Sequence, residues 1–390
     1  MRFLKISGAM LCLAIITMIM AYTATKITDV DFSGKIKVKL GLPGVPWERA
    51  RPKQEGMNPK SLANLRDNLA KHDTTAFLVV RGGKLIYEWY AQGSGPNHPH
   101  YSAAMAKALT GMTTLLVCLT DGTLHLNDSL SKFSTAIKPD SQRSQITVED
   151  LAFHKSGLDD VDFYQGKLGK LKGWKKNYYD YPTRRFRFAV LKDPILFQPG
   201  SAEKYSGIGY YALAYAASKS LKKTPYKNIK DLLHKRIMLP LDIPGNQWLL
   251  SYGDSYKIDG MTLYAFGSGL TITARATAKI AELMLQQGQW KGRQLIDPIW
   301  IDKILAKDPS QDRPLASTNH GWILNIDKKW PSLPTDAYAG MGGGNQITLV
   351  IPSLDLIMVR NGENLSSAPG KQNVMLDRII FKPLINSIIK

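Results

Sequence analysis

Residues 101–107 read Tyr-Ser-Ala-Ala-Met-Ala-Lys and open an apolar stretch that runs to Thr120. This composition predicts a buried helix that begins near Ser102. Residues three apart in its first turn share one face, and the start of a helix offers free N–H groups and a positive partial charge. A serine three residues before Lys107 would combine a nucleophile, a general base and an oxyanion-binding N–H group, but that position holds Ala104. The plainer alternative is a core helix capped by Ser102.

Two pairs of β-rich runs lie near opposite ends of the chain. Phe77–Val80 and Lys84–Trp89 flank a glycine turn, which is typical of a hairpin. Gln346–Ile351 and Leu354–Arg360 form the second pair, whereas residues 102–300 are mainly helical in pattern. This order predicts one antiparallel sheet from both chain ends, with helices on its faces and a mostly helical subdomain. The expected fold class is therefore α+β.

Two helices are expected beside the strands at the chain ends. Leucines at helical spacing lie between residues 58 and 73, and Asn58 is a suitable N-cap. A second amphipathic helix, at about 373–389, closes the chain. Each of these helices has an apolar side that can cover the sheet.

The first 25 residues have the layout of a targeting segment. Arg2 and Lys5 form a basic start, and the apolar run that follows is long enough for a marginal membrane span. A cleaved signal peptide and an uncleaved N-terminal membrane anchor are both open. We therefore expect an exported protein that is periplasmic or anchored to the inner membrane. Residues 26–57 are basic and contain prolines, and we interpret them as an arm or tether ahead of a domain at 58–390.

The composition is that of a globular protein with a strong positive charge. The 390 residues are 44% hydrophobic and 21% charged, which excludes a disordered chain, and two cysteines exclude a disulfide-stapled scaffold. Lysine and arginine outnumber the acidic residues by 51 to 32, giving a net charge of +19. This charge favours anionic surroundings, and we expect association with an anionic membrane surface. Residues 167–187 interleave basic and aromatic side chains, but export argues against a nucleic-acid partner, so we interpret them as a solvated loop.

Three further segments indicate a known family. Residues 154–158 read His-Lys-Ser-Gly-Leu, residues 197–200 read Phe-Gln-Pro-Gly, and residues 267–275 read Gly-Ser-Gly-Leu-Thr-Ile-Thr-Ala-Arg. In this order, they resemble the motifs of the beta-lactamase-related serine hydrolases. That family includes class C beta-lactamases, D-alanyl-D-alanine carboxypeptidases of the penicillin-binding-protein type, esterases and 6-aminohexanoate-dimer hydrolases. The similarity spans about residues 58–385 and implies a beta-lactamase/transpeptidase-like fold and hydrolysis of an ester or amide through an acyl-enzyme.

The resemblance places the family's catalytic groups unevenly on this chain. The lysine of its Ser-x-x-Lys motif falls on Lys107 and the serine falls on Ala104, which has no nucleophilic atom. The tyrosine of its Tyr-x-Asn motif falls on Tyr205, but Gly207 replaces the asparagine. The strand that carries Lys-Thr-Gly or His-x-Gly falls near Ala339-Gly340-Met341, without the cation. The resemblance thus implies that Lys107 and Tyr205 share proton transfer, with residue 104 as the nucleophile position.

Four further residues are expected to contact the substrate: Ser102, Ser206, Gly340 and Gly342. No cofactor or metal is implied, because the seven histidines show no HExxH spacing and the cysteines form no CxxC pair. The expected partner is a small ester or amide. A beta-lactam carboxylate fits less well, because the cation that would recognise it is missing.

Three explanations of Ala104 are open. An experimenter replaced the serine, or it was lost naturally in a protein that keeps the site for binding, or the enzyme uses a neighbouring hydroxyl such as that of Ser102 or Ser206. The principal hypothesis is a serine hydrolase of this family whose nucleophile position reads Ala104. The alternative is a catalytically inactive binding protein with the same fold.

Overall fold

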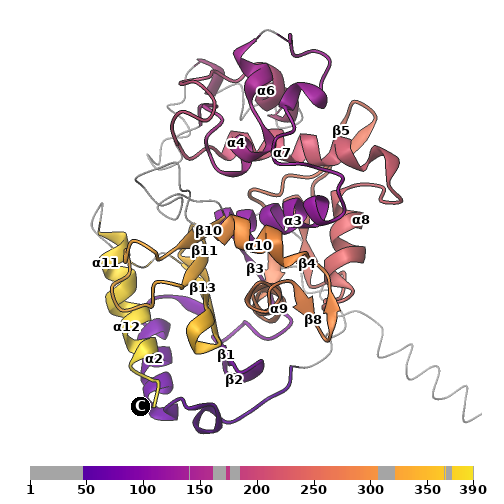
Figure 1. Ribbon diagram of the computed structural model, residues 1–390. Coiled ribbons are helices and arrows are strands. Elements are labelled where there is room, and N and C mark those ends of the chain that lie inside the picture. Colours follow the sequence, from indigo (N-terminus) through magenta and orange to yellow (C-terminus); the bar gives the residue numbers. More distant parts are fainter. Residues whose placement is uncertain are drawn as a thin grey trace, which may run out of the picture.

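The computed structural model describes residues 47–139, 141–160, 173–175, 185–305, 321–363, 365 and 371–389. The expected targeting segment lies outside the described residues, and so do most of the expected arm and most of the stretch 167–187. Within the described part, a central sheet and its helices fill the lower half of the view in Figure 1, and a helical region fills the upper half.

The central sheet is six-stranded and antiparallel, with the order β10-β11-β12-β13-β1-β2. Its strands are β1 (Thr74–Arg81), β2 (Lys84–Tyr90), β10 (Trp322–Leu324), β11 (Tyr338–Gly342), β12 (Gln346–Ile351) and β13 (Leu356–Gly362). The two chain ends meet where β1 pairs with β13, for example at Phe77 opposite Arg360. The predicted sheet built from both chain ends is therefore confirmed.

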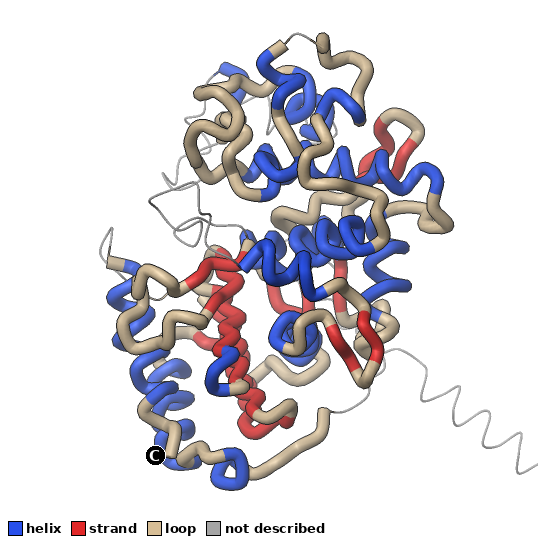
Figure 2. The backbone as a smooth tube through the Cα atoms, viewed as in Figure 1, coloured by secondary structure: helices blue, strands red, loops and turns tan. Residues whose placement is uncertain are grey.

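Helices cover both faces of this sheet. Along β1, Phe77 and Val79 join one hydrophobic cluster, whereas Leu78 and Val80 join another, because successive side chains of a strand point to opposite faces. The first face packs against α2 (Pro59–Ala70) and the C-terminal helices, and the second packs against α9 (Ala274–Leu285). Figures 1 and 2 show these helices on opposite sides of the strands.

The two helices expected beside the chain ends are present. α2 begins after Asn58, whose side-chain oxygen accepts hydrogen bonds from the N–H groups of Lys60 at 3.0 Å and Ser61 at 3.2 Å. The predicted N-cap is thus confirmed, although α2 ends at Ala70, earlier than expected. The terminal helix consists of α11 (Gln372–Leu376), a π-helical turn (Asp377–Phe381) and α12 (Lys382–Ile385).

The region between the sheet strands is mainly helical. Its helices are α3 (Thr113–Thr120), α4 (Val148–Ala152), α6 (Arg185–Leu191), α7 (Gly207–Ser220), α8 (Ile229–Leu233) and α10 (Pro298–Leu305), besides α9. Its short strands are β3 (Pro99–Tyr101), β7 (Thr271–Thr273) and β4 (Trp248–Leu249) in one sheet, and the pairs β5 (Tyr256–Ile258) with β6 (Met261–Leu263) and β8 (Gln289–Trp290) with β9 (Arg293–Gln294). The α+β class is confirmed.

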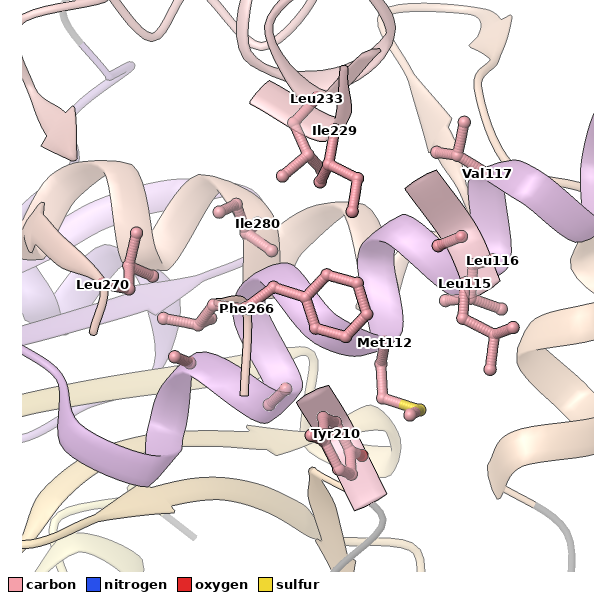
Figure 3. Packing of buried hydrophobic residues seen from close by; sticks show 14 of the residues in the cluster. Met112, Leu115, Leu116, Val117, Tyr210, Ile229, Leu233, Phe266, Leu270 and Ile280 are labelled. Atoms are coloured by element: carbon pink, nitrogen blue, oxygen red, sulfur yellow. The ribbon is translucent and has the colours of Figure 1, made fainter. Parts of the chain in front are cut away.

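The apolar helix that opens near residue 102 forms the core between the sheet and the helical region. It runs from Ala103 to Thr120, and Figure 3 shows its Met112 and Leu115 in one cluster with side chains such as Phe266. Among the described residues it is the one helix that is long and apolar enough to cross a membrane. Most of it is buried inside the protein, as in a core helix of a globular domain.

Candidate functional site

The helix start at residue 104 is distorted. Ala103–Met105 form a 3₁₀ turn and Lys107–Met112 a π-helical stretch, and regular α-helix begins only at Thr113. Ala103 has a φ of 47°, in the left-handed region that residues with a Cβ atom rarely adopt. Such backbone strain concentrates at functional sites. Ala104, which follows it, is only half-buried, so the predicted nucleophile position is accessible.

Ser102 fixes the backbone directly before this turn. Its N–H group and its hydroxyl both donate to the carbonyl oxygen of Leu270, at 3.0 and 2.6 Å. The residue is fully buried, and its side chain makes no capping bond to the helix. Ser102 thus occupies the N-cap position of the first turn, as in the plainer alternative, but without a side-chain capping bond. The hydroxyl is bonded to Leu270, so the residue has a structural role here, and its contact with substrate stays a prediction.

Lys107 lies where three of the sequence motifs meet. Its Nζ donates to the carbonyl oxygen of Gly267 at 2.8 Å, in the segment 267–275. The same Nζ lies 4.7 Å from the ring centroid of Tyr205 and 5.2 Å from that of Tyr210. The side chain is almost entirely buried. The structure thus brings the expected pair, Lys107 and Tyr205, into direct contact.

Tyr205 is held in place by the loop that carries His154. The two rings lie 4.8 Å apart, and Nδ1 of His154 accepts a hydrogen bond from the N–H group of Ser206 at 3.1 Å. Burial raises the pKa of the Tyr205 hydroxyl, and the nearby carboxylate of Asp160 raises it further. The hydroxyl therefore stays protonated at neutral pH and can donate a hydrogen bond beside Lys107.

The glycines of β11 allow this strand to pass directly beneath the helix start. A Cβ atom at Gly340 would lie 2.8 Å from Cβ of Ala108. A Cβ atom at Gly342 would overlap the carbonyl oxygen of Ser102 and lie 3.1 Å from the nitrogen of Ala104. Both glycines are therefore needed for close packing, and Gly342 brings the strand backbone next to the N–H group of residue 104. Their contact with substrate stays a prediction.

Replacing Gly342 by alanine is expected to force β11 away from residue 104. The added Cβ meets backbone atoms, which cannot rotate aside, so we expect the free energy of unfolding to fall by about 1–3 kcal/mol. Urea denaturation measures this change. Gly343→Ala is the matched control, because a Cβ there would lie 3.5 Å from Cβ of Ala103, an ordinary contact. Equal stability of the two variants would contradict the packing argument.

Gly321 is a site residue that the sequence motifs do not reveal. Its φ is 86°, and a Cβ atom there would lie 2.7 Å from the carbonyl carbon of Lys107 and 2.8 Å from the nitrogen of Ala108. The chain ahead of β10 therefore packs against the backbone of the π-helical stretch at a distance that only glycine permits. No local pattern signals this contact, because the two segments are far apart in the sequence.

Ser206 and Gly207 occupy the rest of the Tyr-x-Asn position. Ser206 is almost fully buried, and its hydroxyl caps α7 by accepting from the N–H group of Gly209 at 2.9 Å. It also donates to the carbonyl oxygen of Asp159 at 3.3 Å, so both bonds of this hydroxyl stabilise the fold, and its contact with substrate stays a prediction. At Gly207, the N–H group donates to Oδ2 of Asp160 at 3.0 Å. A Cβ atom at 207 would lie 3.5 Å from that carboxylate, which therefore stands beside the place of the absent asparagine.

The arrangement brings together the two residues that are expected to transfer protons, without an attacking group. Lys107 and Tyr205 lie together beside a helix start, whose first N–H groups have no partners within the helix. Residue 104 presents a methyl group at the position that a nucleophile would need. The hydroxyls of Ser102 and Ser206 are buried and bonded to backbone carbonyls. In the part of the chain that the structure describes, no group of three or more histidine, cysteine or acidic side chains could hold a metal ion.

Comparison with known proteins places this geometry in a family. A family model described as Beta-lactamase matches residues 63–364. That range contains the site residues described above and extends from α2 to the end of β13. A comparison with curated proteins finds no match.

Solved structures share the fold at low sequence identity. A protein described as a 6-aminohexanoate-dimer hydrolase from Bacillus anthracis is 17% identical, with a TM-score of 0.63 over 92% of each chain. A penicillin-binding protein homologue from Caulobacter crescentus is 15% identical, with a TM-score of 0.60 over 84% of this chain and 99% of that one. A family VIII carboxylesterase is 15% identical, with a TM-score of 0.59 over 84% and 99%. These likenesses confirm the expected beta-lactamase/transpeptidase-like fold.

Proposed function

Because the chain belongs to the beta-lactamase family, we propose that it binds a small ester or amide at residue 104 without forming an acyl-enzyme. The proposal is supported by the contact of Lys107 with the ring of Tyr205 beside a side chain that cannot attack. Lys107 and Tyr205 are in contact, whereas Ala104 ends in a methyl group. The proposal therefore favours the binding protein over the working hydrolase.

The neighbouring hydroxyls are poor substitutes for the absent serine. Ser102 would need to break its 2.6 Å bond to the carbonyl of Leu270, and Ser206 would need to leave the start of α7. Each is buried, so attack on a substrate would also require the backbone around it to open. A side chain already bonded to a backbone carbonyl has no general base in position to accept its proton.

The proposed ligand class follows from the charges near β11. Ala339, Gly340 and Met341 supply no cation, so a ligand that depends on a carboxylate anchor has no partner on this strand. An ester or amide carbonyl needs only hydrogen-bond donors, which the N–H group of residue 104 and the adjacent strand backbone can supply. This supports a small neutral acyl compound over a beta-lactam.

Two measurements on the unmodified chain test the proposal. Ligand-observed saturation-transfer NMR with N-butylacetamide is expected to show binding. Hydrolysis of p-nitrophenyl butyrate is expected to be no faster than in buffer, because no acyl-enzyme forms. Ala104→Leu fills the nucleophile position and is expected to abolish the saturation transfer.

The matched control is Ala70→Leu, on the exposed end of α2 and away from Lys107, which is expected to bind like the unmodified chain. Equal binding by Ala104→Leu would show that the ligand lies elsewhere. Turnover of the ester by the unmodified chain, with an acyl group detected on the protein by mass, would overturn the proposal.

A further inference from the structure

A cavity of about 700 Å³ adjoins the nucleophile position on the side of β3. Tyr101, at the end of β3, lines it, and so does Gly343, in the turn after β11. A Cβ atom at Gly343 would lie 3.5 Å from Cβ of Ala103, so the cavity wall contacts the residue directly before the nucleophile position. The cavity lining therefore lies next to the segments that flank residue 104.

The lining of the cavity is polar and carries one negative charge. Its members include Thr75, His98, His100, Tyr101, Tyr252 and Glu363. Among the lining residues that the structure describes, Glu363 is the one carboxylate, and none is a lysine or an arginine. A free anionic group would therefore meet a carboxylate and no counter-charge.

Arg360, on β13, is a buried cation whose hydrogen-bond donors are all used within the fold. Its five N–H groups donate to oxygen atoms of the surrounding fold, namely Thr74 Oγ1 and the carbonyls of His72, Gly344, Asn345 and Glu363, at 2.7–3.0 Å. The guanidinium thus fixes the backbone that forms the cavity wall. It has no donor left for a ligand.

The two histidines of the lining are uncharged at neutral pH. Burial lowers the pKa of His100 to about 3, and it also lowers the pKa of His98. Nδ1 of His100 lies 3.2 Å from the hydroxyl oxygen of Thr75. Its Nε2 atom is buried and has no hydrogen-bond partner among the described residues. The two rings thus add no positive charge to the lining.

Two aromatic rings complete the lining. Tyr101 and Tyr252 are stacked, with ring centroids 5.1 Å apart and an interplanar angle of 17°. Tyr101 is the more exposed, with 39% of its surface accessible. Tyrosine rings attract quaternary or protonated ammonium groups through their negative faces. The negative face of the ring does not attract a carboxylate.

We propose that this cavity binds the ammonium-bearing arm of an ester or amide whose carbonyl lies at residue 104. Glu363 supplies the counter-charge and the tyrosine pair supplies the aromatic surface, while His98 and His100 add no positive charge. The proposal rests on the proposed function for the position of the carbonyl. What is new is the positive charge of the ligand's substituent, which the resemblance to the family does not predict.

Isothermal titration calorimetry of the unmodified chain tests this with three acetamides of equal length. Their N-butyl chains end in trimethylammonium, tert-butyl or carboxylate. We expect the ammonium compound to bind about tenfold more tightly than its tert-butyl isostere, from one cation–π contact and one exposed ion pair, and the carboxylate to bind most weakly. Glu363→Gln and Tyr101→Leu are each expected to reduce the ammonium preference about threefold or more.

Glu149→Gln is the matched control, because this glutamate is also exposed but lies on α4, outside the cavity lining. It is expected to leave the ammonium preference unchanged. Equal affinity for the ammonium and tert-butyl compounds, tighter binding of the carboxylate, or no binding of any compound would overturn the cavity proposal.

Butyltrimethylammonium, which has no carbonyl, separates the two proposals. If it binds as tightly as the acetamide and Glu363→Gln weakens both equally, the cavity proposal holds and the proposed carbonyl position fails.

Discussion

The Ala104→Ser variant is expected to hydrolyse p-nitrophenyl butyrate, whereas the unmodified chain is expected to show only the background rate. The new hydroxyl would stand one helical turn before Lys107. The side chain of Lys107 is already in contact with the ring of Tyr205. Loss of a serine nucleophile costs on the order of 10⁶-fold in turnover in a complete site. Because the asparagine and the strand cation are absent here, we expect a gain of at least about 10³-fold, below that full value. Steady-state absorbance of p-nitrophenolate measures it.

Two further variants show whether the gain comes from the proposed chemistry. Ala104→Gly changes the same position without adding a hydroxyl and is expected to stay at the background rate. Adding Lys107→Met to Ala104→Ser is expected to return turnover to near the background, because the serine loses the group that accepts its proton. Activity that is equal in the unmodified chain and in Ala104→Ser would remove residue 104 from the nucleophile position.

The second large effect is expected on stability. Replacing Arg360 by methionine removes a buried guanidinium and its five hydrogen bonds. Arg360 lies on β13, opposite Phe77 of β1. Four backbone carbonyls would then be left without these donors. We expect the free energy of unfolding to fall by about 3–5 kcal/mol, because several buried carbonyl oxygens lose their hydrogen-bond donors at once. Urea denaturation followed by circular dichroism measures the change.

Arg378→Met is the matched control for this experiment. Arg378 is an exposed arginine on the C-terminal helical run, and we expect its replacement to change the free energy of unfolding by no more than about 0.5 kcal/mol. If Arg360→Met proved as stable as Arg378→Met, the guanidinium would not hold the sheet end together. The cavity wall described above would then also lack its support.

Much of the fold was predictable because its strands and helices carry strong local patterns. β12 was expected at Gln346–Ile351 and has those bounds, since its run of apolar residues is bounded by turn residues on both sides. The next strand was expected from Leu354 but begins at Leu356. The difference has a local cause, because Pro352–Leu354 form a 3₁₀ turn and Asp355 adopts a left-handed φ of 45°. A turn of this kind is defined by its backbone dihedral angles, which the pattern of hydrophobic residues does not predict.

The candidate site was predictable only where a motif names the residue. Lys107 and Tyr205 were expected together and are in contact. The hydroxyls of Ser102 and Ser206 were expected at the substrate, but each bonds a carbonyl from a distant segment, at Leu270 and Asp159. Such partners are set by tertiary packing, so no local pattern reveals them. The cavity lining combines segments from residues 75 to 363 and is hidden from the sequence for the same reason.

The most direct test of the central claim is the intact mass of the protein after incubation with a fluorophosphonate, which labels activated serines. We expect Ala104→Ser to gain the mass of one label and the unmodified chain to gain none. That result would place an activatable nucleophile position at residue 104, beside Lys107 and Tyr205. A label on the unmodified chain, or none on a folded Ala104→Ser variant, would contradict the claim that residue 104 is the nucleophile position beside Lys107 and Tyr205.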